Sequence, residues 1–178
     1  MTKTKILLLT LSTASIIGVI TLLILMIKKS YFTIQELCYS ETAEKYNIDN
    51  TPTPEARENL KALINEVLNP TRKAFGAKIT VNSGYRCPEL NKKVGGEASS
   101  QHLKGEAADI TAGSIEKNRT LFKIIALHGV YDQLIWEKGG QWIHVSYKSS
   151  GMNRLAMLDY NGTSYKNINN NWENAIHA

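Results

Sequence analysis

The chain has 178 residues, with 21 lysines and arginines, 16 aspartates and glutamates, four histidines and two cysteines. This length suits one domain with a hydrophobic core, and a composition of 43% hydrophobic and 21% charged residues excludes a disordered, collagen-like or disulfide-dense protein. The formal charge of +5 arises almost entirely within residues 1–30, which hold four lysines and no acid; the rest has 17 basic and 16 acidic residues. Residues 31–178 are nearly neutral and have no surplus of positive charge to bind phosphates, so we expect no nucleic-acid partner.

A run of 22 uncharged residues, 6–27, lies between two pairs of lysines. As a helix it would extend about 33 Å, enough for a bilayer core of about 30 Å. The run is apolar on all faces and meets Lys28 without the small residues of a cleavage site. We therefore predict an uncleaved signal anchor, a transmembrane helix within residues 1–30. A cleaved signal peptide followed by secretion is the alternative, and the symmetric lysines leave the orientation open.

The segment after this run contains predicted helices and a strand. One helix begins with Thr53 as its N-cap and Pro54 in its first turn, and it carries a single apolar stripe. We expect the Asn-Pro step at 69–70 to interrupt this helix, with another turn or two ending at Gly76. A short strand over 78–82 follows. The stripe consists of Leu60, Leu63, Ile64, Val67 and Leu68.

The second half of the chain combines one helix with several strands. Ser114 can cap a helix that ends at Gly129. The pattern of apolar residues predicts three strands, over residues 107–111, 132–137 and 142–147. Helices and strands do not alternate as repeating βαβ units, so we predict an α+β fold with a small antiparallel sheet flanked by helices.

The last thirty residues are rich in asparagine. We predict a hairpin around Asn161-Gly162 followed by a loose tail, and we assign no chemistry to either. The predicted organisation is therefore an anchor in 1–30, a folded domain in 31–158 and an Asn-rich hairpin and tail in 159–178.

Three side chains suggest a metal site: His102, Asp109 and His144. Two imidazoles and a carboxylate, with a fourth position left for water, are a ligand set of catalytic zinc. Each residue taken singly has a simpler interpretation, because a lone histidine in an apolar strand is more often structural and an aspartate can merely cap a turn. The spacing alone therefore leaves both readings open.

The predicted hairpin over 132–147 adds a geometric argument. A two-residue turn centred on the Gly-Gly step at 139–140 pairs Ile135 with His144 and Glu137 with Trp142. Side chains alternate between the faces of a sheet, so Glu137 and His144 share one face as diagonal neighbours, about 7–8 Å apart at the backbone. Glu137 is thus placed to act as a general base beside a metal held by His144, unless it is simply a solvated carboxylate.

Four segments of the chain resemble the zinc D-Ala-D-Ala carboxypeptidase family. They are "SGYRCPELNKKVGG", "SSQHLKGEAADI", "DQLIWE" and "WIHVSY". This family is related to phage L-alanyl-D-glutamate endolysins, the vancomycin-resistance D,D-peptidases and the hedgehog signalling domain, and the resemblance covers residues 32 to about 158. It implies the hedgehog-type D,D-peptidase fold, with an N-terminal helical segment in "TIQELCYSETA" and "NLKALINEVLNPTRKAFG".

The resemblance also implies residue roles. One catalytic Zn²⁺ would be bound by His102, Asp109 and His144. Arg86, in the "SGYR" element, would bind the substrate or stabilise its oxyanion, as a guanidinium suits a carboxylate or a developing negative charge. Ser100 and Gln101 would help to position the substrate.

The chain departs from many relatives at the catalytic base. They have a Glu or Asp three residues before the last ligand, where this chain has Gln141. An amide cannot act as a base, and a regular strand would point Gln141 away from His144. The subgroup that this chain resembles most has a Glu at the end of the preceding strand, which corresponds to Glu137.

The expected activity is zinc-dependent hydrolysis of peptidoglycan stem peptides at a bond involving a D-amino acid, as in a D-Ala-D-Ala carboxypeptidase. The alternatives are a membrane-tethered phage-type endolysin that cuts L-Ala-D-Glu, and a zinc-stabilised binding module without catalysis. We expect a membrane-anchored enzyme on the cell-wall side, with no obligate protein partner.

Three further residues have simpler expectations. Cys38 and Cys87 either pair in an oxidising compartment or serve as small buried hydrophobes. His128, at a predicted helix end, is expected to be structural.

Overall fold

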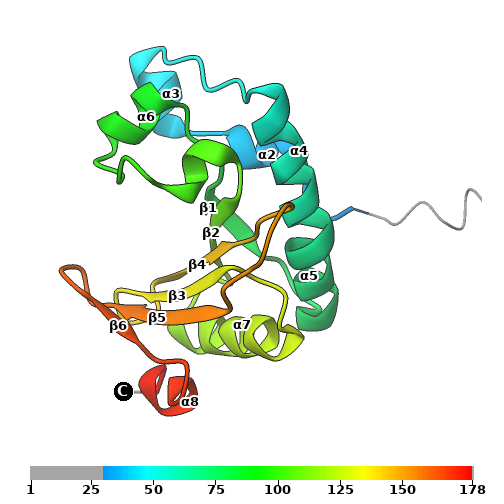
Figure 1. The fold of residues 1–178 in the computed structure, drawn as a ribbon, viewed down its shortest axis with the longest axis vertical. Helices are drawn as coiled ribbons and strands as arrows, with labels where there is room; N and C mark the ends of the chain where they lie inside the picture. Colours follow the sequence, from blue (N-terminus) through cyan, green and yellow to red (C-terminus); the bar gives the residue numbers. More distant parts are fainter. Residues whose placement is uncertain (1–29, 178) are drawn as a thin grey trace, which may run out of the picture. The chain divides into compact units, whose positions relative to one another are not determined.

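The computed structural model describes residues 30–177, and the chain from Tyr31 onward forms one compact unit (Figure 1). The predicted anchor over 6–27 lies outside the described residues. Among the residues that are described, no helix has the length and apolar character needed to cross a membrane.

A six-stranded sheet, in the order β1-β2-β4-β3-β5-β6, forms the centre of this unit. The strands are β1 (Thr80–Ser83), β2 (Ala107–Thr111), β3 (Gln133–Glu137), β4 (Trp142–Ser146), β5 (Ala156–Tyr160) and β6 (Tyr165–Asn167). The α+β class is confirmed.

The sheet is larger than predicted and is not purely antiparallel, because β3 and β5 run parallel. Both edges of β4 are already paired, with β2 and β3, so β5 cannot pair with β4 and instead adds at the nearby free edge of β3. Since β4 ends beside the start of β3, the connection over 147–155 begins β5 at that same end and gives it the direction of β3.

The two faces of the sheet differ in character. One face packs against α7 (Ile115–His128), which begins at the predicted Ser114 cap and ends at Gly129 (Figure 1). The buried strand residues on this face are Ala108, Ile110, Leu134, Trp136, Ile143, Val145 and Met157. Because side chains alternate, the intervening residues, several of them polar, point to the opposite face.

The long helical segment after Thr53 does not break where the Asn-Pro step predicted. It continues through α4 (Pro54–Leu63), the π-turn η1 (Ile64–Leu68) and α5 (Asn69–Phe75). Proline has no N–H and its ring crowds the carbonyl one turn back. That carbonyl, on Glu66, instead faces Nε2 of His128 at 3.3 Å. The wider turn and this outside donor accommodate the proline, and His128 has the structural role expected of it.

The remaining helices gather beside β1 and β2 (Figure 1). They are α2 (Ile34–Cys38), α3 (Glu41–Tyr46), α6 (Pro88–Lys93) and the 3₁₀ turn η2 (Gln101–Lys104). Asn50 links α2 to the start of α6: its amide donates to the carbonyls of Cys38 and Tyr85 at 2.8 and 3.0 Å, and its oxygen accepts from the Cys87 N–H at 2.8 Å. Both cysteines are free thiols, and burial raises the pKa of Cys38 to about 11.

The C-terminal segment forms the predicted hairpin, since β5 pairs with β6 in antiparallel register. The prediction of a loose tail after this hairpin is wrong. Ile168 and Ile176 are only 3% and 2% exposed, and Arg119 on α7 donates to the Ile176 carbonyl at 2.8 Å. Trp172, at the start of α8 (Trp172–Ala175), contacts the ring of Phe122. A few apolar residues within an asparagine-rich stretch are enough to dock it on the core.

The β3–β4 hairpin has the predicted register, with Ile135 opposite His144 and Glu137 opposite Trp142. Its turn is longer than the two residues expected. The Glu137 carbonyl accepts from the N–H groups of both Gly140 and Gln141, and the residues at 138, 139 and 140 all have positive φ. Asn118 on α7 holds this turn by donating to the Gly140 and Gln141 carbonyls at 2.8 and 3.1 Å.

This turn gives a stability prediction with a matched control. At Gly139, with φ 68°, an added Cβ would have no atom within 4 Å. Gly139→Ala should therefore lower the free energy of unfolding by about 1 kcal/mol, the cost of placing alanine in a left-handed conformation. At Gly140, with φ 84°, the Cβ would overlap the ring of Trp136, which is buried against Phe122. Gly140→Ala should therefore cost about 3 kcal/mol. Urea unfolding of both variants measures the difference, and equal losses would contradict this packing.

Candidate metal centre and cleft

The predicted ligands come together on the sheet face opposite α7. Asp109 on β2 is the register partner of His144 on β4, and both side chains point away from the core. His102 reaches them from η2, which packs against β2. Residues 42 positions apart in the chain are thus brought into contact by one strand pairing and one loop.

The donor atoms are spaced as a tetrahedral zinc ion requires. His102 Nε2 lies 3.2 Å from His144 Nδ1 and 3.3 Å from Asp109 Oδ1. His144 Nδ1 and Asp109 Oδ1 are 2.9 Å apart. Ligands at about 2.0–2.1 Å from a tetrahedral ion lie about 3.3 Å from one another. The three residues therefore fit zinc in both donor type and geometry, and three protein ligands leave a fourth position for water or substrate.

The orientation of His102 is set by the "SGYR" element. Its Nδ1 donates to the Gly84 carbonyl at 2.6 Å, which leaves the Nε2 lone pair for a metal. The Arg86 N–H donates to the His102 carbonyl at 3.1 Å. Glycine is required at 84, since any Cβ there would overlap the Leu37 carbonyl of α2. The motif thus serves first to hold the ligand loop in place.

Electrostatics favour the protonation states of His102 and Asp109 that a metal needs. Burial lowers the pKa of His102, which favours the neutral imidazole. Burial by itself raises the pKa of Asp109, but the electrostatic attraction and the hydrogen bonds of the His102 and His144 rings outweigh it and hold that pKa well below its usual range. Arg86 Nη2 lies 3.7 Å from Asp109 Oδ2 and adds a cation at this end of the site.

Glu137 lies on the same face as His144, two residues along β3 from Ile135, the register partner of His144. Its side chain is largely buried, at 8% exposure. Burial, and then the negative charge of Asp109, raise the pKa of Glu137 to about 7 against the opposing effects of His144 and Lys138. A carboxyl group with this pKa can both accept and release a proton near neutral pH.

A cleft of about 500 Å³ opens over this face of the sheet. All of the residues predicted for the site line it: Arg86, Ser100, Gln101, His102, Asp109, Glu137 and His144. Ser100 also caps η2 by accepting from the His102 N–H at 3.3 Å. Gln141 is exposed and lies outside the cleft lining, which agrees with the prediction that it points elsewhere.

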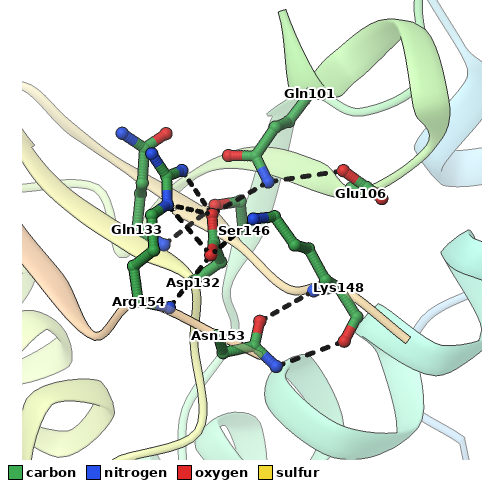
Figure 2. Close-up of polar contacts among 8 residues, drawn as sticks. All are labelled: Gln101, Glu106, Asp132, Gln133, Ser146, Lys148, Asn153 and Arg154. Carbon is green, nitrogen blue, oxygen red and sulfur yellow. Dashed lines mark hydrogen bonds and ion pairs between the residues drawn. The ribbon is translucent and has the colours of Figure 1, made fainter. Parts of the chain in front are cut away.

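Sequence reasoning missed the far wall of the cleft. This wall comes from the start of β3 and from the segment before and within β5–β6, and it includes Gln133, Arg154, Tyr160 and Tyr165. Figure 2 shows Arg154 held by the buried carboxylate of Asp132. Gln133 belongs to the quoted segment "DQLIWE" but was given no role. No motif marks Arg154, Tyr160 or Tyr165, and their only signal in the sequence is an arginine and two tyrosines within an otherwise asparagine-rich segment.

Comparisons with known proteins agree with the predicted family. A family model described as Peptidase M15 matches residues 30–146. The chain is also 50% identical over 48 residues to a zinc D-Ala-D-Ala carboxypeptidase of Streptomyces albus G, a match that covers 26% of this chain and 19% of that protein. The chain thus spans about a fifth of that relative's length. These matches and the His-Asp-His group support Zn²⁺ as the cofactor. Because the family model covers well over half of the chain, the chain belongs to the peptidase M15 family, which confirms the prediction of a zinc metallopeptidase.

Proposed function

We propose that the chain hydrolyses peptidoglycan stem peptides at a bond that involves a D-amino acid, in the manner of a D-Ala-D-Ala carboxypeptidase. The observation that carries this proposal is the convergence of His102, Asp109 and His144 in a cleft that also contains Glu137. The cleft is open to solvent along the sheet, so an extended peptide can lie across it.

His102, Asp109 and His144 would hold Zn²⁺, which when bound polarises a scissile carbonyl and makes water more acidic. Glu137 accepts the proton of the attacking water and passes it to the leaving amine, a role that suits its raised pKa. Arg86 offers its guanidinium to the substrate carboxylate or to the oxyanion that forms. Ser100 and Gln101 border the ligand loop and position the peptide.

Two alternatives differ in what the same cleft would do. A phage-type endolysin would cut L-Ala-D-Glu with the same residues, so only the products distinguish it. A zinc-stabilised binding module would not need a buried carboxyl group beside the metal, and Glu137 therefore favours an enzyme.

The predicted anchor over 6–27 suggests where the enzyme works. We propose that it tethers the catalytic domain to the membrane on the cell-wall side, in the periplasm or outside the cell, with release after signal cleavage as the alternative. This location brings the cleft to its substrate without a protein partner.

Mass spectrometry of purified stem peptides, incubated with the zinc-loaded full chain, tests this proposal. Release of a terminal D-Ala from the pentapeptide is expected, and a strong chelator should remove the activity, which added Zn²⁺ restores. Cleavage after L-Ala would instead support the endolysin alternative. Intact peptides at every zinc concentration would contradict hydrolysis and favour the binding module.

A further inference from the structure

The far wall of the cleft contains an arginine with an unusually well-defined position. Asp132, just before β3, is fully buried, and its carboxylate accepts from Nε and Nη2 of Arg154 and from the Arg154 backbone N–H (Figure 2). Lys148 Nζ lies 3.2 Å from the same carboxylate, and Gln101 donates to it at 3.2 Å. Burial opposes ionisation of Asp132, but Arg154 and Lys148 lower its pKa to about 2, so it is charged at neutral pH.

The backbone around Arg154 is fixed as firmly as its side chain. The next residue, Leu155, has φ 52°, a left-handed conformation that strains a non-glycine residue. Asn169 donates to the Leu155 carbonyl at 2.8 Å, and the Ala156 N–H donates to the Asp132 carbonyl at 3.1 Å. Such strain persists only where surrounding contacts determine the conformation, and here those contacts aim Arg154.

One edge of the Arg154 guanidinium remains free. The bonds to Asp132 use Nε and Nη2, whereas Nη1 has no hydrogen bond within the described residues and points away from the carboxylate in Figure 2. The side chain is 50% exposed and lines the same cleft as the metal ligands. Glu106 acts on the guanidinium only through its charge and accepts from Gln101 instead. A fixed guanidinium with a free edge in a substrate cleft is suited to bind a carboxylate.

Gln101 connects Asp132, which holds this arginine, with the ligand loop, because it bonds to Asp132 and precedes His102 in η2. Its amide nitrogen donates to Asp132 and, at 3.4 Å, to Glu106, so its oxygen Oε1 is the free end. Oε1 is buried and has no hydrogen-bond partner. An unpaired buried acceptor is destabilising, and a hydrogen bond from a substrate N–H would remove that cost.

We propose that Arg154, positioned by Asp132, binds a carboxylate of the stem peptide at a distance from the scissile bond, while Gln101 Oε1 accepts a hydrogen bond from a substrate N–H. The inference rests on the proposed peptidase function and extends it to substrate selection. Arg86 stands beside Asp109 at the metal end, so the cleft has guanidinium groups at two different places. Arg154 lies beyond the segment 30–146 that matches the family model.

In a stem peptide with lysine at its third position, two carboxylates have the required chemistry: the α-carboxylate of a γ-linked D-Glu and the carboxylate at the C-terminus. The test compares the parent peptide with two amidated forms, one at each carboxylate. For the parent peptide, Arg154→Gln should lower kcat/KM about 10- to 100-fold, mainly through KM, as expected for one charge-assisted hydrogen bond. For the peptide amidated at the recognised carboxylate, the substitution should have little effect, which also identifies that carboxylate.

Lys148→Gln is the matched control, because Lys148 also pairs with Asp132 but does not line the cleft. It should leave the preference for the carboxylate intact. Asp132→Asn should weaken the preference while zinc content stays at about one ion per chain. Arg154→Lys should retain part of the preference that Arg154→Gln loses, because lysine keeps the positive charge but cannot form the paired hydrogen bonds of a guanidinium.

Two results would overturn the inference: an equal loss on all three peptides in Arg154→Gln, which indicates a structural role, or no loss on any of them. If the wild-type chain cleaves no stem peptide, the proposed function fails separately. Calorimetric binding of the same three peptides to zinc-loaded Glu137→Gln protein, with and without Arg154→Gln, still decides whether Arg154 recognises a carboxylate.

Discussion

His144→Ala is expected to lose both zinc and peptidase activity while the domain stays folded. Its Nδ1 lies 2.9 Å from Asp109 Oδ1 and 3.2 Å from His102 Nε2, so its removal leaves two donors where a catalytic zinc site needs three. Zinc content should fall from about one ion per chain to near zero, as metal analysis after dialysis will show. His102→Ala should do the same.

The control for these variants is His128→Ala. His128 lies on α7 and faces the Glu66 carbonyl, so its loss should cost about 1 kcal/mol of stability and no zinc. Full zinc content in His144→Ala would refute the ligand assignment, and thermal unfolding will establish that the variant is folded.

Glu137→Gln should retain zinc but lower kcat at least about 100-fold, the usual scale for one acid–base group. The substitution preserves the size of a buried side chain but removes its ability to take up a proton. Metal analysis and steady-state kinetics on the stem pentapeptide measure the two effects separately.

The same variant tests the unusual position of the base. Many relatives have an acid where this chain has Gln141, an exposed residue outside the cleft lining. Adding Gln141→Glu to Glu137→Gln should therefore restore no activity. Recovery in the double variant would show that a carboxylate at 141 can reach the substrate and that Glu137 is not required.

Local patterns were sufficient to predict the half of the site that lies on the β3–β4 hairpin. A turn of known place and strict alternation along two strands put Glu137 and His144 on one face, and the register agrees. The turn itself is longer than expected, yet the pairing survives because Trp136 and Ile143 must both face the core. Burial, rather than the turn, therefore determines the register.

Apart from the metal ligands, which the family resemblance supplied, contacts between distant segments were beyond sequence reasoning. The approach of Arg154 to Asp132 joins a loop to the start of a strand, and neither periodicity nor spacing connects them. The parallel entry of β5 depends on which sheet edge remains free, which is a property of the whole topology. Ile168 and Ile176 are buried although their neighbours are mostly polar, so average composition concealed how the tail docks.

The central claim is that three side chains on the open face of the sheet form a zinc centre for hydrolysis. Diffraction from zinc-loaded crystals, recorded on either side of the zinc absorption edge, tests it most directly. An anomalous peak at about 2.0–2.2 Å from His102 Nε2, His144 Nδ1 and an oxygen of Asp109 is predicted. A zinc peak bound elsewhere, with these three side chains unliganded, would contradict the account.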